Sequence, residues 1–450
     1  MATIIATKNN KSLFGILLLL VLTNCSQQIT PNREVVSEAS QSVKFIPYLT
    51  GSQKADGVLV KYRSDVNSST RARSLSSAGL VETQENELLN DVVLADTVDG
   101  LSVNETLTSL SNDPNVLYAE PNYIITPKAI VPNDPEFSKQ LALNNPDNID
   151  IDAPEAWEFT TGSKNIVIAV IDSGVDYTHP DLKNQMWKNT GEIPDNQIDD
   201  DNNGYVDDVM GWDFESNDND PMDEHDHGTL VAGAIGAEGN NNLGISGINW
   251  QVQLMPVRFI NAQGAGSTAN AILAIKYAIQ NGAKISNNGW GGASFSQSLF
   301  DAIQLANEQG HLFVAAAGND ALDNDKSPHY PSSYNLPNII SVAALDHLDK
   351  LASFSNFGLT RVDIAAPGVN IYSTTRNNKY AALSGSSMAS ALVTGSIGLM
   401  MARSDLLTAQ ELKDNLLASI IPLPNLTNFI GTGGKLNLYN AVNSVKVPVP

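Results

Sequence analysis

Four polar side chains in this sequence stand where a predicted strand ends or a predicted helix begins. Asp172 and Asn319 each follow an apolar run, whereas His227 and Ser387 each open a stretch rich in small and apolar residues. A serine hydroxyl becomes a nucleophile when an imidazole takes its proton and amide donors stabilise the oxyanion. Each residue taken alone is equally consistent with an ordinary role, such as a helix cap, a structural histidine or an Asx turn.

The segments that carry these residues predict an α/β domain with a mostly parallel sheet covered by helices on both faces. Short apolar runs alternate with longer helical stretches, which is the pattern of such three-layer folds. The predicted strands are 166–171, 252–258, 284–286, 312–316 and 339–343, and the predicted helices are 229–236, 268–280, 298–309 and 387–403. In sheets of this kind the chemistry lies at the carboxyl ends of the strands, so we expect the four residues to meet there.

In this order, the four residues resemble the subtilisin-like serine protease family, and the likeness extends from about Asp134 to Ala441. The matching segments are 170–174 (VIDSG), 227–233 (HGTLVAG), 316–319 (AAGN) and 385–389 (GSSMA). The resemblance implies the three-layer subtilisin-like fold. It also implies that Asp172 orients the imidazole, His227 acts as general base and then acid, and Ser387 attacks the peptide carbonyl. The side-chain amide of Asn319 and the backbone N–H of Ser387 would form the oxyanion hole.

Three positions depart from the family pattern without removing a catalytic atom. Ser386 replaces the usual threonine before the nucleophile, Leu230 replaces a histidine, and residues 391–392 replace Pro-His. Two other functions stay open at this point: a binding lipoprotein with a vestigial triad, and a hydrolase of esters rather than peptides. The cluster of acids and histidines at 223–227 lacks the spacing of an HExxH zinc site, which disfavours a catalytic metal.

Residues 286–292 (SNNGWGG) resemble the family's edge strand that pairs with the substrate backbone. Gly289 replaces the usual serine, but main-chain pairing does not require that side chain. This strand and the end of the run 312–318 would form the walls of the pocket for the P1 side chain, the one that precedes the scissile bond. The sequence does not define which side chain this pocket prefers. The residues expected to contact a polypeptide substrate are Gly289, Trp290, Gly291, Ala316 and Gly318.

The chain of 450 residues carries a formal charge of −23, which makes nucleic acid an improbable partner, because phosphate contacts need clustered Lys and Arg. Thirteen acids and no Lys or Arg lie between residues 195 and 226. Within this block, 199–207 fits D-x-D-x-N-G followed by an acid at the ninth position, a spacing that suits Ca²⁺. The alternative is a solvated acidic turn. The predicted ligands are Asp199, Asp201, Asn203, Tyr205 through its backbone, and Asp207.

The N-terminus has the features of an export signal. Lys8 and Lys11 precede the apolar run 13–22, which is too short to span a bilayer as a helix. The following residues 22–25 (LTNC) resemble a bacterial lipobox, which implies cleavage before Cys25 and lipidation of that cysteine. We therefore expect an exported protein that is anchored to a bacterial membrane by lipid, or released outside the cell after processing. Cys25 is the only cysteine, so an intramolecular disulfide is excluded.

We expect the whole chain to divide into five parts: a signal peptide (1–24), a linker (25–55), a propeptide (56–126), an activation segment (127–148) and the catalytic domain (149–445). Apolar runs in the propeptide predict a β-α-β-β-α-β order and a small ferredoxin-like α+β domain. Residues 118–123 (YAEPNY) match the family's inhibitor-like propeptide closely. That likeness implies a zymogen whose own propeptide inhibits it and assists folding, with self-cleavage between about residues 125 and 132.

Overall fold

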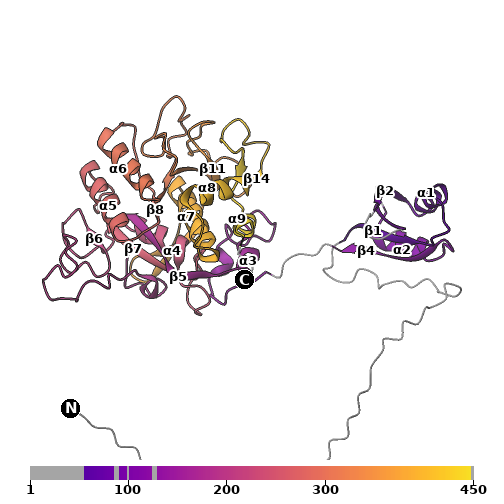
Figure 1. Ribbon diagram of the computed structural model, residues 1–450, viewed down its shortest axis with the longest axis horizontal. Helices are drawn as coiled ribbons and strands as arrows, with labels where there is room; N and C mark the ends of the chain where they lie inside the picture. The colour runs from indigo at the N-terminus through magenta and orange to yellow at the C-terminus, as the bar shows by residue number, and fades with distance from the viewer. Residues whose placement is uncertain (1–54, 86–90, 99–100, 124–128, 447–450) are drawn as a thin grey trace, which may run out of the picture. The chain divides into compact units, whose positions relative to one another are not determined.

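The computed structural model describes residues 55–85, 91–98, 101–123 and 129–446, which form two compact units that divide between Thr126 and Pro127 (Figure 1). The predicted signal peptide, Cys25 and the linker up to residue 54 lie outside the described residues. Among those that are described, no helix is both long enough and apolar enough to cross a bilayer.

The N-terminal unit is a four-stranded antiparallel sheet with two helices. Its elements are β1 (Ala55–Tyr62), α1 (Ser68–Ser77), β2 (Leu80–Glu85), β3 (Val92–Thr97), α2 (Val103–Leu110) and β4 (Val116–Tyr123). The sheet order β2-β3-β1-β4 confirms the predicted ferredoxin-like fold. Helix α2 begins with a capping box, in which Ser102 and Glu105 satisfy each other's backbone N–H. The unit has its own core, which includes Val58, Val60 and Leu107.

The C-terminal unit is built on a nine-stranded sheet in the order β14-β15-β11-β10-β9-β8-β5-β7-β6, in which every pair except β14–β15 is parallel. The strands are β5 (Gly162–Asp172), β6 (Trp212–Asp213), β7 (Gln251–Arg258), β8 (Ile285–Asn288), β9 (Leu312–Ala316), β10 (Ile339–Leu345), β11 (Ile364–Pro367), β14 (Ile421–Pro422) and β15 (Gly434–Lys435). A separate hairpin pairs β12 (Ile371–Thr375) with β13 (Lys379–Leu383).

Helices cover both faces of this sheet, as predicted. They are α3 (Ala153–Ala156), α4 (His227–Gly236), α5 (Thr268–Gln280), α6 (Gln297–Glu308), α7 (Ser386–Arg403), α8 (Ala409–Ala418) and α9 (Leu438–Ser444), with 3₁₀ turns η2 (Phe137–Lys139) and η3 (Lys183–Gln185). Alternate residues of β5 separate the two cores, because side chains alternate across a strand. Ile168 and Val170 pack with α4 and α7, whereas Ala169 and Ile171 pack with α5 and α6.

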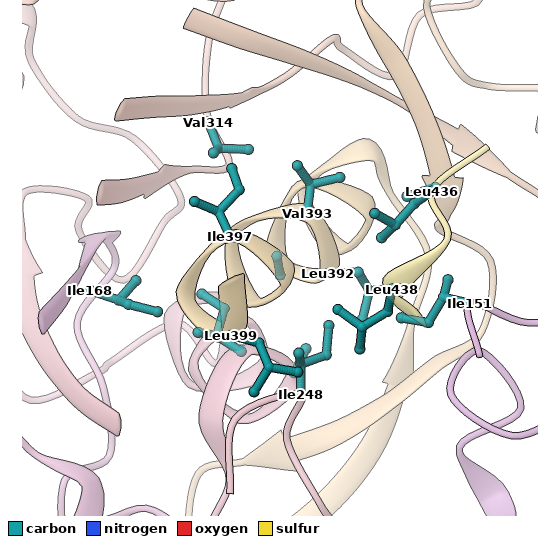
Figure 2. Packing of buried hydrophobic residues seen from close by; sticks show 14 of the residues in the cluster. Ile151, Ile168, Ile248, Val314, Leu392, Val393, Ile397, Leu399, Leu436 and Leu438 are labelled. Carbon is teal, nitrogen blue, oxygen red and sulfur yellow. The ribbon is translucent and has the colours of Figure 1, made fainter. Parts of the chain in front are cut away.

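Helix α7 lies at the centre of the larger core (Figure 2). Every residue from Ser386 to Met400 is buried, which suits a helix that is surrounded by protein on all sides. Figure 2 shows Leu392, Val393 and Ile397 of α7 among residues of the sheet and of the C-terminal segment. Small residues permit this close packing, since a methyl group on Gly398 would lie 2.6 Å from Cδ1 of Ile168.

The predicted elements are present with ends shifted by up to four residues, but several short ones were not predicted. Strands β6, β14 and β15 have two residues each, too few to show a period in the sequence. The predicted β-α-β-β-α-β order carries no bounds for its first helix, which is α1 and has a largely polar sequence. This helix begins at the cap Asn67, which accepts a hydrogen bond from the N–H of Thr70 (3.0 Å).

Candidate active site

The four predicted residues meet at the carboxyl end of β5. Strands β7 and β8 flank β5 on opposite sides, so the chain crosses over β5 there, the position where such sheets form their sites. Asp172 is the last residue of β5, and Asn319 lies three residues beyond β9. His227 and Ser387 lie in the first turns of α4 and α7.

Asp172, His227 and Ser387 form one chain of hydrogen bonds. Nδ1 of His227 lies 2.7 Å from Oδ1 of Asp172, and Nε2 lies 2.9 Å from Oγ of Ser387. Because Nδ1 faces a carboxylate it carries the proton, which leaves Nε2 free to accept the proton of the serine hydroxyl. Asp172 is fully buried and Ser387 is 5% exposed, so solvent screens this charge arrangement weakly.

Opposing effects set the pKa of His227. Burial lowers this pKa, but the charge and hydrogen bond of Asp172 and the charge of Asp223 raise it more, so it lies above the ordinary value of 6.5. Oδ1 of Asp172 also accepts a hydrogen bond from the N–H of Ser173 (2.7 Å). Oδ2 is buried without a hydrogen-bond partner among the described residues.

Asp223, which the sequence analysis did not single out as catalytic support, joins the end of β5 to the start of α4. Its buried carboxylate accepts five hydrogen bonds from main-chain and hydroxyl groups. The donors are Ser173 Oγ (2.9 Å), His225 N (2.8 Å), Asp226 N (3.1 Å), Thr229 N (2.9 Å) and Thr229 Oγ1 (2.5 Å). This carboxylate therefore fixes the turn that places His227. An acid six residues before Thr229, near a helix start, was the available signal.

The turn of the β12–β13 hairpin holds the same helix start from the other side. Asp226, whose φ is +83°, accepts hydrogen bonds from Thr375 Oγ1 (2.7 Å) and from the backbone N–H (3.2 Å) and Nε (3.0 Å) of Arg376. A left-handed conformation is unfavourable for a residue with a side chain, so these bonds stabilise the conformation that precedes His227. Nothing in the sequence connects two segments that lie 150 residues apart.

Two N–H donors lie close to Ser387 Oγ, because a Cβ atom on Gly385 would lie 3.1 Å from that oxygen, 3.7 Å from Nδ2 of Asn319 and 3.8 Å from N of Ser387. Oδ1 of Asn319 accepts a hydrogen bond from the N–H of Ser386 (2.8 Å), which fixes the orientation of the side-chain amide. The N–H of Ser387 lies in the first helical turn, where N–H groups have no acceptor within the helix. The N–H of Gly318 donates to Oγ of Ser386 (3.2 Å), which ties the end of β9 to the turn that contains Ser386 and Ser387.

The predicted substrate residues all line one cleft of about 340 Å³ beside the triad. They are Gly289, Trp290, Gly291, Ala316 and Gly318. Gly289 permits the closest approach, because a Cβ atom there would lie 2.9 Å from Cβ of Ser387 and 3.1 Å from Cε1 of His227. His225 is exposed and lines the same cleft, with its ring centroid 6.4 Å from that of His227.

The acidic segment, residues 192–226, brings together a set of carboxylates that differs from the predicted calcium ligands. Oxygens of Glu192, Asp201 and Asp208 lie within 4.8 Å of one another. Of the predicted ligands, only Asp201 belongs to this cluster. Asp199 accepts hydrogen bonds from the N–H groups of Asn203 (3.0 Å) and Gly204 (2.8 Å), and Asp207 accepts from the N–H groups of Asn196 (3.2 Å) and Gln197 (2.9 Å). The ring of Tyr205 packs on Trp212, Phe214 and Tyr277.

Comparison with known proteins agrees with this geometry. Residues 163–439 match the subtilase family, and residues 52–122 match the fervidolysin N-terminal prodomain. A thermophilic serine proteinase of Bacillus sp. strain AK1 is 36% identical over 414 residues, which cover 91% of each chain. Thermitase of Thermoactinomyces vulgaris is 35% identical over 314 residues, 69% of this chain and 99% of thermitase. Halolysin of Haloferax mediterranei is 34% identical over 400 residues, 87% of this chain and 70% of halolysin. The chain belongs to the subtilase family of serine proteases and carries an N-terminal prodomain.

Proposed function

We propose that Ser387 is the nucleophile of an endopeptidase, with His227 as general base and Asp172 as the group that orients it. His227 Nε2 takes the proton of Ser387 Oγ while that oxygen attacks the scissile carbonyl carbon. The protonated imidazole then gives this proton to the leaving amine, and an acyl-enzyme remains. Water repeats the sequence and releases the acid product. The unbroken contact from Asp172 Oδ1 through the imidazole to Ser387 Oγ is the observation that carries this proposal.

Asn319 and the backbone N–H of Ser387 would stabilise the oxyanion of each tetrahedral intermediate. Charge develops on the carbonyl oxygen only as Oγ attacks, so donors fixed beforehand stabilise the transition state more than the substrate. The hydrogen bond from Ser386 N to Asn319 Oδ1 supports this role, because it holds the amide before substrate arrives. An extended polypeptide substrate would lie along residues 289–291, and its backbone would pair with the backbone of these residues.

A fluorophosphonate probe and a processing gel test this assignment. We expect the probe to label the matured wild type, and the Ser387→Ala variant to resist labelling and to keep its full length. Ser384→Ala, which changes an exposed serine three residues away, is the matched control and should still mature. If Ser387→Ala still shortens by the length of the propeptide, self-processing is wrong. Absence of labelling in the wild type would favour the vestigial-triad alternative, and ester turnover without peptide cleavage would favour the esterase.

We further propose that Ca²⁺ binds in the acidic segment, at Glu192, Asp201 and Asp208. Three carboxylates so close together repel one another strongly unless a cation lies between them, and oxygen ligands suit Ca²⁺. Bound Ca²⁺ would supply structural stability rather than chemistry. With ligand at about 100 times its dissociation constant, binding to the folded state alone adds about 2.7 kcal/mol. Chelation should therefore lower the thermal midpoint of wild type and of Asp195→Asn, an exposed control, but hardly change that of Asp208→Asn. Equal midpoints with and without chelator in the wild type would contradict the site.

We also propose export and lipid anchoring at Cys25. The support is the sequence of features near the N-terminus, where basic residues are followed by a short apolar run and then by the cysteine. Several acyl chains would hold the protein firmly at a membrane, since each buried CH₂ contributes about 0.8 kcal/mol. Labelling with a radioactive or alkyne fatty acid in a bacterial host should mark the wild type and spare Cys25→Ser. A wild type that is exported without label would exclude the anchor. The fractions that contain the catalytic domain before and after maturation would show whether self-cleavage releases it.

A further inference from the structure

The cleft beside Ser387 contains a histidine that the catalytic mechanism does not use. His329 lines it together with Gly291, Gly318 and Asn319. A peptide whose carbonyl carbon is attacked by Ser387 Oγ, and whose oxygen is held by Asn319, must place the P1 side chain in this same cleft. The position of His329 determines how much room this cleft leaves for the P1 side chain. This inference rests on the proposed function.

The imidazole of His329 lies between the two walls of the cleft. A methyl group on Gly291 would overlap Cε1 of the ring and lie 2.9 Å from Nδ1, and a methyl group on Gly318 would lie 3.0 Å from Cδ2. Nε2 is bonded to both Cε1 and Cδ2, so it faces the space between the walls. The ring thus takes up depth that two glycine walls would otherwise leave open.

Hydrogen bonds hold this histidine in place. Its N–H donates to Ser333 Oγ (3.1 Å), and its carbonyl accepts from Ser332 Oγ (2.8 Å) and from the N–H of Ser333 (2.8 Å). The next residue, Tyr330, pairs with Gly292 through two backbone hydrogen bonds of 2.7 and 2.8 Å. These bonds tie the backbone of His329 and Tyr330 to the wall that contains Gly292. A P1 side chain therefore cannot move the imidazole aside by shifting this backbone.

The ring's chemistry narrows the choice of P1 side chain. Burial lowers the pKa of His329, although the charge of Asp320 raises it, and the net direction is downward, which keeps the imidazole neutral near pH 7. A neutral imidazole offers one donor and one acceptor. An apolar P1 group pressed against Nε2 would leave that nitrogen buried without a partner, which is costly. The exposed carboxylate of Asp320 in the same cleft disfavours an acidic P1 side chain.

We propose that His329 is a specificity-determining residue, which shortens the P1 pocket and selects side chains that are short enough to end at the ring and can hydrogen-bond to Nε2. Glutamine and asparagine have this size and chemistry. Phenylalanine and tyrosine would be excluded by the ring.

Peptides that differ only at P1 (Gln, Phe, Arg or Glu) test the proposal with the matured protein. For wild type we expect kcat/KM for Gln to exceed that for Phe at least tenfold. His329→Gly should open the pocket and raise kcat/KM for Phe at least tenfold. His329→Leu keeps the volume and removes the polar nitrogen, so it should lower kcat/KM for Gln about fivefold or more without a gain for Phe. His347→Gly, an exposed histidine outside the cleft, is the matched control and should leave all ratios unchanged.

Titration of Ser387 with the fluorophosphonate probe separates the two levels of the proposal. Where the probe labels each variant and the peptides are cleaved, the P1 ratios judge His329 alone. A wild type that prefers Phe, Arg or Glu, or a His329→Gly variant with the wild-type Gln-to-Phe ratio, overturns the specificity proposal. If no variant is labelled and no peptide is cleaved, the proposed peptidase function fails first.

Discussion

Replacing Asp223 by asparagine should change both the stability of the protein and the pH dependence of its activity. The carboxylate accepts five hydrogen bonds, two of them on Oδ2 from Thr229. An amide puts an NH₂ group at one of the oxygen positions, where it faces a backbone N–H. Hydrogen bonds to a charged group contribute about 1.5–3 kcal/mol each, so the loss of one or two predicts destabilisation of about 2–5 kcal/mol. At roughly 2 °C per kcal/mol for a domain of this size, the thermal midpoint should fall by about 4–10 °C.

The same substitution should also lower the pKa of His227. The negative charge of Asp223 stabilises the imidazolium form and so helps to raise the pKa of His227 above 6.5. Since only the neutral imidazole can take the proton of Ser387, kcat/KM rises with pH through this pKa. Asp223→Asn should therefore shift the acid limb of the kcat/KM profile to lower pH. Profiles between about pH 4.5 and 9 with one peptide substrate would measure the shift.

A matched variant separates these two effects. Thr229→Val removes the hydroxyl that donates to Asp223 but keeps the charge, so it should lower the thermal midpoint and leave the acid limb in place. Glu215→Gln removes an exposed charge from the same segment and should change neither quantity. If Asp223→Asn lowers activity at every pH and the limb does not move, Asp223 acts through the fold alone and the electrostatic reasoning is refuted.

Three further changes test other parts of the molecule. Asn319→Ala should lower kcat by about 10²–10³ with little change in KM, a range known for the oxyanion donor of subtilisin itself, and unchanged kcat would exclude the amide from the oxyanion hole. Lys413→Met removes a mostly buried ammonium that donates to two backbone carbonyls, and should cost roughly 2–4 kcal/mol in urea unfolding, whereas the exposed Lys350→Met should cost almost nothing. Gly233→Ala would force α4 away from β12, because the methyl group overlaps a threonine hydroxyl; we expect a net loss of about 1–3 kcal/mol despite a gain of about 1 kcal/mol in helix propensity, and a stabilised variant would contradict this packing.

The catalytic geometry could be predicted from sequence because each residue is tied to a regular element. Asp172 directly follows a run of six apolar residues, and Ser387 lies in the first turn of a helix that is rich in small and apolar residues. In a parallel sheet the strand ends meet at one edge, so the order of elements nearly determines the site. The walls of the cleft followed in the same way, since Gly289 and Gly318 continue β8 and β9.

What could not be predicted lies in irregular segments, where position depends on distant contacts. His329 follows a loop that shows no period, and its place in the cleft depends on contacts such as the pairing of Tyr330 with Gly292. The Asp226–Arg376 contact joins two turns that sequence spacing cannot relate. The predicted ligand loop 199–207 did show a spacing, but Glu192 and Asp208, which approach Asp201, stand outside that pattern.

The acidic segment owes its composition mainly to hydrogen bonding of the main chain. Between η3 and α4, all of which the structure describes, the only helix or strand is the two-residue β6, so the backbone N–H groups must find acceptors other than a ladder. Carboxylates supply many of them, and charge-assisted bonds of this kind are strong. Glu192 accepts from three backbone N–H groups, Asp199, Asp207 and Asp213 from two each, and Asp223 from three.

The acidic residues of this segment therefore have a structural role whether or not a metal binds. The proposed cation would act where Glu192, Asp201 and Asp208 converge, because their oxygens lie within 4.8 Å of one another. It follows that removal of Ca²⁺ should loosen the segment around Asp201 and leave the bonds of Asp213 and Asp223 intact. The support of His227 by Asp223 would then be independent of the metal, and chelation would act on stability before it acts on the triad.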